Sequence, residues 1–188
     1  EELTKGSFGF AEETGKMINS AINEGVKKGS GIGEAVGDMI IQTNFPYKEK
    51  SILVTARTLG IPVTIHVALG TDIIHLHPYA DGALIGEGSM RDFKTFTSLV
   101  SNLNNGVYIN LGSAVILPEI FLKALALVKN LGYDVEKITT VNIDFVRQYR
   151  SITNVVTRPT SAGGKGYNLI GHHELIFSLL ATAILEMI

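Results

Sequence analysis

The sequence predicts an α/β fold with a mainly parallel sheet. Short β-favouring runs alternate with longer stretches whose apolar residues recur at helical spacing, and this alternation is typical of parallel sheets with right-handed crossovers. The chain has 188 residues, a length that fits one α/β domain, residues 1–188. It does not begin with methionine and it ends inside an apolar helical pattern, so we expect it to be part of a longer protein.

The first 60 residues predict helices and no strand. We expect helices at residues 11–22, 34–41 and 51–59. The glycine-rich stretch before the second helix contains GSGIGEAVG, residues 29–37, which is superficially similar to a dinucleotide-binding fingerprint. Such a fingerprint needs a strand before it. Since no β-favouring run precedes this one, we interpret it as a flexible surface loop that opens a helix.

Strands and helices alternate in the rest of the chain. Predicted strands span residues 61–67, 107–111 and 138–143, with a short strand that includes Leu169 and Ile170. Predicted helices span residues 89–103, 118–131 and 174–186. The run IPVTIHV at 61–67 is rich enough in β-branched residues to be buried on both faces, and Ser89 suits the N-cap of the helix that follows.

The clearest strand–turn–helix unit lies in the middle of the chain. The strand run VYINL is followed by the small-residue turn Gly112-Ser113-Ala114. Pro118 and Glu119 suit a first helical turn, because an N–H there has no partner and a negative charge favours the helix dipole. The turn lies at the carboxyl end of its strand, where open α/β sheets bind ligands.

All loops that follow strands are expected at one edge of the sheet, because right-handed crossovers place them there. These loops span residues 68–88, 112–117, 144–168 and 171–173. They hold most of the unusual polar residues, so this edge is the predicted ligand site. Asp72 and Asp144 follow strands, where a carboxylate can accept ribose hydroxyl groups, but Asp144 could equally cap a turn.

Four of the five histidines fall in these loops. The residues that could ligate a divalent metal are Asp72, His75, His77, His173 and Glu174, and such a site would make the protein a metal-dependent hydrolase. Their spacing matches no metal signature. The alternative is that the histidines hydrogen-bond a ligand or the backbone, and we assign no metal ligand from the sequence.

Lys165 stands in a glycine loop, GGKG at 163–166. A lysine amine attacks a carbonyl or imine carbon only when it is neutral, which requires burial or a neighbouring cation. A lone lysine is normally a solvated surface charge, and spacing alone favours that interpretation.

Several segments together resemble deoxyhypusine synthase and its bacterial relatives. EKSILVTARTLGIPVTIHVALGTD at 49–72 resembles the family's helix, IPV strand and Thr-Asp loop. GVYINLGSAVILPEIFLKALALVKNLG at 106–132 resembles its glycine-ended strand and the following helix. ITTVNID at 138–144, RPTSAGGKG at 158–166 and GHHELIFSLLATAI at 171–184 follow in the family's order, and FAEET at 10–14 is similar to its Val-Glu-Glu-Asp segment.

The resemblance implies a Rossmann-like three-layer sandwich that binds NAD in a homo-oligomer, a tetramer or a dimer. It implies a transferase or oxidoreductase that acts on a small amine, with Lys165 as the imine-forming lysine. Histidine titrates near neutral pH, so His75, His77 or His173 would carry protons. The predicted cofactor-binding residues are Glu13, Thr71, Asp72, Gly112, Ser113, Thr140, Asn142 and Asp144. Gly164 stands where the family has a tryptophan before its lysine, so a non-catalytic nucleotide-binding protein is a further alternative.

Composition argues against several classes of protein. The net charge of −2 argues against a nucleic-acid-binding protein, and the absence of cysteine excludes disulfides and thiolate sites. The longest apolar run, residues 175–185, is shorter than the ~20 residues that span a bilayer. With no visible signal peptide, we expect a cytoplasmic protein. Hydrophobic residues at 45% against 18% charged residues indicate buried subunit interfaces.

Overall fold

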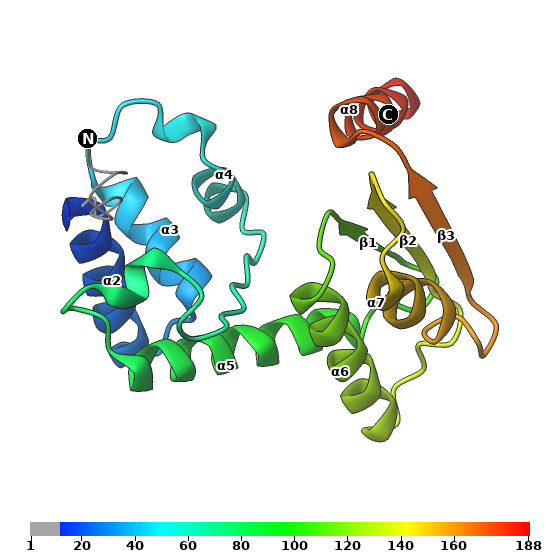
Figure 1. The fold of residues 1–188 in the computed structure, drawn as a ribbon, viewed down its shortest axis with the longest axis horizontal. Coiled ribbons are helices and arrows are strands. Elements are labelled where there is room, and N and C mark those ends of the chain that lie inside the picture. Colours follow the sequence, from blue (N-terminus) through cyan, green and yellow to red (C-terminus); the bar gives the residue numbers. More distant parts are fainter. Residues whose placement is uncertain (1–11) are drawn as a thin grey trace, which may run out of the picture. The chain divides into compact units, whose positions relative to one another are not determined.

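The computed structural model describes residues 12–188, and the chain divides into two compact units (Figure 1). Unit 1 is Glu1–Thr95 and unit 2 is Phe96–Ile188. The boundary between the units falls inside the helix α5 (Gly82–Val100), which contributes residues to both, and the single domain at residues 1–188 stays a prediction.

Unit 1, as far as it is described, consists of helices and loops. Its elements are α2 (Glu12–Lys27), α3 (Ile32–Gln42), η1 (Lys48–Lys50), α4 (Ile52–Thr58), η2 (Ile73–Leu76) and the first part of α5. Its core is a cluster of aliphatic side chains from α2, α3 and α5, namely Ile22, Val26, Ile32, Val36 and Ile85. The predicted helices are confirmed here, except that the predicted start at Ala11 lies outside the described residues.

Residues 61–67 have no regular secondary structure, so the strand predicted there is wrong. The N–H groups of Ile65 and Val67 donate instead to two side chains of α5. Asp92 Oδ2 accepts the first at 2.9 Å and Ser89 Oγ the second at 3.1 Å. Because side chains already use these backbone donors, they are not available to pair with a neighbouring strand.

Helix α5 begins at Gly82, earlier than the predicted start at Ser89. The cap is Asp81, whose Oδ1 accepts the N–H groups of Ala83 at 2.9 Å and Leu84 at 3.1 Å. An aspartate oxygen that binds the first free N–H groups is a typical helix start. The sequence analysis missed it because three glycines follow, at positions 82, 86 and 88, and glycine disfavours helices.

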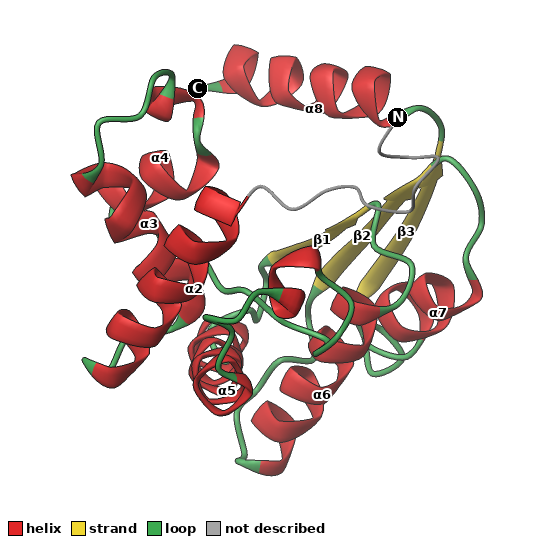
Figure 2. Ribbon diagram, turned by 60° about the vertical axis from the view of Figure 1, so that its left-hand side comes forward, coloured by secondary structure: helices red, strands yellow, loops and turns green. Residues whose placement is uncertain are grey.

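Unit 2 contains a three-stranded parallel sheet, so the prediction of an α/β fold with a parallel sheet is confirmed there. The strands are β1 (Val107–Leu111), β2 (Thr139–Asp144) and β3 (Lys165–Ile170), in the order β1-β2-β3. The helical elements are α6 (Ile116–Asn130), α7 (Tyr149–Ser151), the π-helical segment η3 (Ile152–Thr157) and α8 (His173–Met187). Figure 2 shows the strands side by side, with α6 and α7 on the same side of the sheet.

The two faces of this sheet differ in burial. On the face that α6 covers, Tyr108 stacks on Phe121 with ring centroids 3.7 Å apart, and Asn110 and Asn142 are buried. Strand side chains alternate between faces, so the opposite face carries every second residue. On the two outer strands these remain about half exposed: Val107 57%, Ile109 43%, Leu111 43%, Tyr167 50% and Leu169 42%. We call these five residues the exposed face.

The predicted loop at 144–168 is wrong over most of its length. It contains α7 and η3, and β3 begins at Lys165 rather than near Leu169. Gly166 explains the close packing of η3 on this strand, because a Cβ atom at position 166 would lie 2.3 Å from the Val156 carbonyl oxygen. The glycines and lysine of this stretch hid the strand from sequence analysis, since none of them favours β structure.

Helix α8 is the most apolar helix of the unit and yet none of its residues is buried. Leu175, Leu179 and Leu185 are 64%, 71% and 74% exposed. Its bounds agree closely with the predicted helix at 174–186. Among the residues that the structure describes, no helix combines the length and the apolar character needed to cross a membrane.

Candidate functional site

The carboxyl edge of the sheet in unit 2 brings together Gly112, Asp144 and His173. The Gly112 N–H donates to the Ile143 carbonyl at 2.9 Å, so the turn after β1 lies beside the end of β2. His173, the first residue of α8, places Nε2 3.3 Å from the same carbonyl oxygen. Gly112 has φ +70°, and a Cβ atom there would lie 3.3 Å from His173 Nε2. Both the turn and the ring contact therefore favour glycine at this position.

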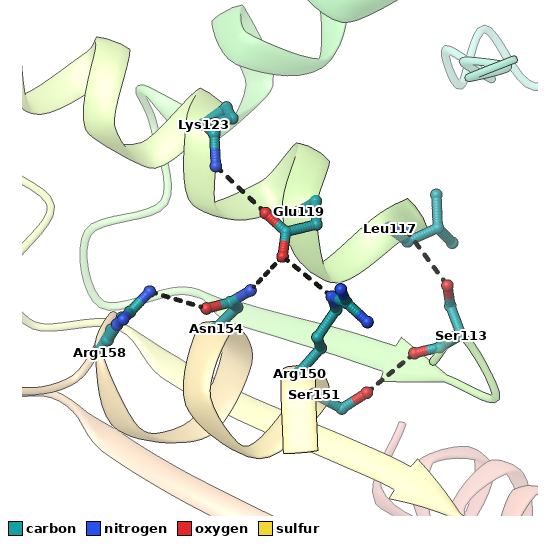
Figure 3. Close-up of polar contacts among 8 residues, drawn as sticks. All are labelled: Ser113, Leu117, Glu119, Lys123, Arg150, Ser151, Asn154 and Arg158. Atoms are coloured by element: carbon teal, nitrogen blue, oxygen red, sulfur yellow. Dashed lines mark hydrogen bonds and ion pairs between the residues drawn. The ribbon is translucent and has the colours of Figure 1, made fainter. Parts of the chain in front are cut away.

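The Ser113 turn is held by hydrogen bonds from two sides (Figure 3). Its carbonyl oxygen accepts from Asn110 Nδ2 and from Ser151 Oγ, each at 2.9 Å. Its hydroxyl oxygen accepts the Leu117 N–H at 3.2 Å, inside the first turn of α6. Ser151 is completely buried. These contacts fix the backbone at the carboxyl end of β1, where a ligand of this sheet would bind.

Three asparagines form a ladder directly beneath this edge. Asn110, Asn142 and Asn168 are paired residues on β1, β2 and β3. Asn110 Nδ2 donates to Asn142 Oδ1 at 2.7 Å, and Asn142 Nδ2 donates to Asn168 Oδ1 at 2.8 Å. Sequence analysis had included only Asn142, although each of the three strand runs carries an asparagine near its end. That repeated position was the available signal.

The loop after β2 presents aromatic and cationic groups beside Asp144. Asp144 is 4% exposed, and its Oδ1 accepts the N–H of Phe145 at 2.8 Å. The Phe145 ring is 62% exposed and lies 6.3 Å from the His173 ring in an edge-to-face arrangement. Tyr149 is 79% exposed and Arg147 is also exposed. An aromatic ring and a cation at a strand end suit a planar base and a phosphate.

A polar network behind the turn joins α6 to η3 (Figure 3). The Glu119 carboxylate accepts from Lys123 Nζ at 3.1 Å and from Asn154 Nδ2 at 2.8 Å, and lies 3.6 Å from Arg150 Nε. The hydrogen bond from Lys123, supported by the charges of Lys123 and Arg150, lowers the pKa of Glu119. Arg158 donates to the Asn154 side chain at 3.2 Å. The sequence had indicated only a helix-dipole role for Glu119.

Two predicted cofactor contacts and the predicted lysine do not reach this edge. Thr140 and Asn142 are completely buried on the covered face, so their side chains support the site without being able to touch a cofactor. Lys165 pairs with Thr139, the first residue of β2. It therefore lies at the amino edge of the sheet, roughly 16 Å from the carboxyl edge at ~3.3 Å per residue. The expectation that Lys165 joins His173 at one edge is wrong.

Thr71, Asp72 and His75 belong to unit 1, where they close a loop on itself. Thr71 Oγ1 donates to the Ala68 carbonyl at 2.7 Å. Asp72 Oδ1 accepts the Ile74 N–H at 3.0 Å as the cap of η2, and His75 Nδ1 accepts the N–H groups of Gly70 and Asp72 at 3.0 and 3.2 Å. These groups bind the backbone, which is the alternative that the sequence left open for the histidines.

His77 and Glu13 also lie in unit 1. His77 Nδ1 accepts the Tyr79 N–H at 3.1 Å, and a Cβ atom on Gly15 would lie 3.0 Å from the His77 ring. Glu13 is exposed in the first turn of α2. Within residues 12–188, no three His, Cys, Asp or Glu side chains are grouped so that they could hold a metal ion. The alternative of a metal-dependent hydrolase thus gains no support from the geometry.

The glycine-rich stretch at 29–37 is packed rather than flexible, contrary to its interpretation as a surface loop. The Gly33 N–H, at the start of α3, donates to Asp92 Oδ2 at 3.0 Å. A Cβ atom on Gly31 would meet Asp92, and one on Gly33 would lie 2.0 Å from the Val63 carbonyl oxygen. A carboxylate of the chain itself thus occupies the helix N-terminus where a nucleotide fingerprint would hold phosphate. Burial raises the pKa of Asp92, and the hydrogen bonds from Ile65 and Gly33 oppose that shift.

A cavity of about 250 Å³ lies beside this cap in unit 1, lined in part by Glu34, Arg57 and Asp92. Its charged groups are already paired. Arg57 lies 2.8 Å from Glu34 and donates to both Asp38 oxygens, at 2.6 and 3.0 Å. Asp92 binds backbone N–H groups, so the charged groups of this cavity are held by the protein itself.

No family model, curated protein or solved structure matches the chain. The resemblance to deoxyhypusine synthase therefore stays a prediction.

Proposed function

We propose that unit 2 is a Rossmann-like nucleotide-binding module whose ligand lies at the carboxyl edge of the sheet. One observation carries this proposal. The Gly112 turn that ends β1 is hydrogen-bonded to Ile143, so that it lies next to Asp144 at the end of β2. In βαβ units that bind dinucleotides, the phosphate lies over the glycine turn after the first strand, and an acid at the end of the second strand accepts ribose hydroxyl groups.

The residues around the turn support binding of an adenosine-type ligand such as NAD. Asp144 is 4% exposed and its Oδ1 already accepts the Phe145 N–H, which leaves Oδ2 as the oxygen for a ribose hydroxyl group. The exposed Phe145 ring offers a stacking surface for a base. Stacking of a base on an aromatic ring contributes about 1–3 kcal/mol in other proteins. Ser113, fixed through Asn110 and Ser151, holds the turn in one conformation, so little ordering is required when the ligand binds.

The proposal covers binding and does not extend to imine chemistry. A lysine that forms an imine with the ligand would have to approach it within bonding distance. Lys165 begins β3 at the opposite edge from Gly112 and His173. The deoxyhypusine-type reaction that the resemblance implies therefore has no lysine in place at this edge of unit 2.

Isothermal titration with NAD, AMP and ribose 5-phosphate tests the proposal. We expect NAD and AMP to bind, and Asp144→Asn to weaken both about tenfold, because a hydrogen bond to a charged group contributes about 1.5–3 kcal/mol. Phe145→Ala should weaken NAD and AMP but leave ribose 5-phosphate unchanged, since that ligand has no base.

Glu136→Gln is the matched control, because it removes one exposed carboxylate that lies before β2, away from the carboxyl edge. The Glu136→Gln variant should bind NAD and AMP with the same affinity as the unsubstituted protein. Absence of NAD and AMP binding to a folded protein, or equal loss of affinity in the Asp144 and Glu136 variants, would overturn the proposal.

A further inference from the structure

Helix α8 has an apolar surface that its own unit does not cover. None of its fifteen residues is buried. Leu179, Leu185 and Met187 are 71%, 74% and 86% exposed. An α-helix that is apolar on all sides is normally enclosed by protein or membrane, and α8 lacks the length and apolar character to span a membrane. The exposed apolar side chains of α8 are therefore suited to packing against a protein surface.

The exposed face of the sheet is a second apolar surface in unit 2 that no helix of the unit covers. It consists of Val107, Ile109, Leu111, Tyr167 and Leu169, all apolar or aromatic and all more than 40% exposed. A sheet in an α/β protein is normally covered by helices on both faces, and here α6 and η3 pack on the opposite one. The outer strands therefore lack a covering helix on this face, whereas Ile143 of the central strand, on the same face, is fully buried.

The dimensions and charges of α8 and the exposed face match. Fifteen residues of helix extend about 22 Å, and six residues of strand extend about 20 Å. Leu175, Leu179 and Glu186 share one stripe of α8, since they are spaced by four and seven residues. With α8 antiparallel to the strands, Glu186 would lie at the amino edge, beside Lys165, which projects on the exposed face with Tyr167 and Leu169.

The start of α8 is fixed away from its own exposed face. The His173 ring lies against Gly112 and 3.3 Å from the Ile143 carbonyl oxygen at the carboxyl edge, and from there the helix runs off the sheet (Figure 2). We propose that α8 of one copy packs on the exposed face of a second copy and that the second copy returns its own α8, forming a two-fold exchanged dimer. Each sheet then gains its second helical layer.

The exchange would cover apolar surface twice, once on each copy. In each copy the stripe of α8 and the exposed face present seven apolar or aromatic side chains that are 42–71% exposed, namely Leu175, Leu179, Val107, Ile109, Leu111, Tyr167 and Leu169. A standard specific interface covers about 800 Å² per partner. Exchange of an element between identical copies is also a common route to a symmetric dimer.

Cysteine cross-linking tests the exchange directly, because the chain contains no cysteine. Ile109→Cys lies on the exposed face and Leu179→Cys on the inward stripe of α8. After mild oxidation, the double variant should run at twice the mass of the 20.3 kDa chain on a non-reducing gel. A cross-linked product of single-chain mass would show that α8 covers its own sheet, and would overturn the proposal. So would the absence of any product.

Light scattering on the unmodified chain should give a dimer. Leu179→Glu should convert it to a monomer, whereas Leu131→Glu, a control at an exposed leucine of α6's C-terminal end, should remain dimeric. Lys165→Glu should weaken the dimer about threefold, and the pair Lys165→Glu with Glu186→Lys should restore it. A monomeric original chain, or a dimer unaffected by Leu179→Glu, would contradict the exchange. None of these outcomes depends on nucleotide binding.

Discussion

The two units satisfy the hydrogen bonds of non-helical backbone in different ways. In unit 1, side chains of α5 bind the 61–67 segment, through Asp92 at Ile65 and Ser89 at Val67. In unit 2, strand backbones pair with each other along β1, β2 and β3, and side chains such as Asp144 and Ser151 bind backbone groups in the loops beside the strands. A β-favouring run thus becomes a strand only where the backbone of another strand pairs with its N–H and C=O groups. A local sequence pattern does not show whether such a partner strand is present.

Removal of the Asp92 carboxylate should have the largest effect on stability. Asp92→Ala leaves the buried N–H group of Gly33 and the partly buried N–H group of Ile65 without their acceptor. We expect unit 1 to lose about 3 kcal/mol of unfolding free energy, since each unsatisfied buried donor costs about 1–3 kcal/mol. Urea denaturation followed by circular dichroism measures the loss, and hydrogen exchange at Ile65 locates it.

Asp81→Ala is the matched control for this substitution. It removes an exposed cap from the same helix, so it should cost only about 1 kcal/mol and leave exchange at Ile65 unchanged. Equal losses in the two variants would show that Asp92 acts as an ordinary cap, and the contrast between the two units would fail.

The asparagine ladder should give the next largest effect, and the loss should depend on position. Asn142→Ala removes both hydrogen bonds of the central residue, at 2.7 and 2.8 Å, and should cost about 2 kcal/mol of unfolding free energy. Asn168→Ala removes only one bond from a partly exposed residue and should cost about half as much. If both variants lose the same amount, the ladder does not act through its central member.

Sequence analysis predicted β1, β2 and α6 more accurately than the 61–67 segment, for a physical reason. β1, β2 and α6 carry regular apolar spacing, and their partners are elements of the same kind. The 61–67 segment is also rich in β-branched residues. It does not form a strand, because the side chain of Asp92, a residue distant in the sequence, accepts the N–H of Ile65. The prediction for Lys165 was wrong in the opposite direction. Its glycine neighbours indicated a loop, whereas pairing with Thr139 makes it part of a strand.

The candidate site was predicted in part. Gly112, Ser113, Asp144 and His173 do gather at the carboxyl edge, because parallel strands must end at one edge. The histidines at 75 and 77 were grouped with them only because a strand had been expected at 61–67. Ser151 could not be predicted, since nothing in its surroundings indicates that its hydroxyl group would reach the Ser113 carbonyl.

The stability of unit 1 should depend on pH through His66, with a smaller effect than either substitution above. Burial lowers the pKa of His66 below 6.5, and the Asp92 charge only partly opposes this shift. The folded state then binds a proton less readily than the unfolded state, so stability is full above 6.5 and falls as the pH drops below that value. Asp92 has a raised pKa, so its own contribution has the opposite sign and is lost as the pH rises through that pKa.

Urea midpoints at about pH 7.5 and about pH 5.5 measure the His66 effect. The original chain should be less stable at the lower pH, and His66→Gln should reduce that difference. His172→Gln is the control, because His172 is an exposed histidine of unit 2. A pH dependence that His66→Gln leaves intact would assign it to other groups.

Loss of the Glu119 carboxylate should have the smallest effect on stability. This substitution compares the charged network around Glu119 with the amide network of the asparagine ladder within unit 2. Glu119 binds Lys123 and Arg150 at the protein surface, and water and salt weaken such pairs. We expect Glu119→Gln to lower the thermal midpoint by no more than about 2 °C, and 1 M salt (a concentration at which the screening length is ~3 Å) to remove the difference. A larger loss that persists in salt would show that the network, rather than the buried Asn110 and Ser151, holds the Ser113 turn.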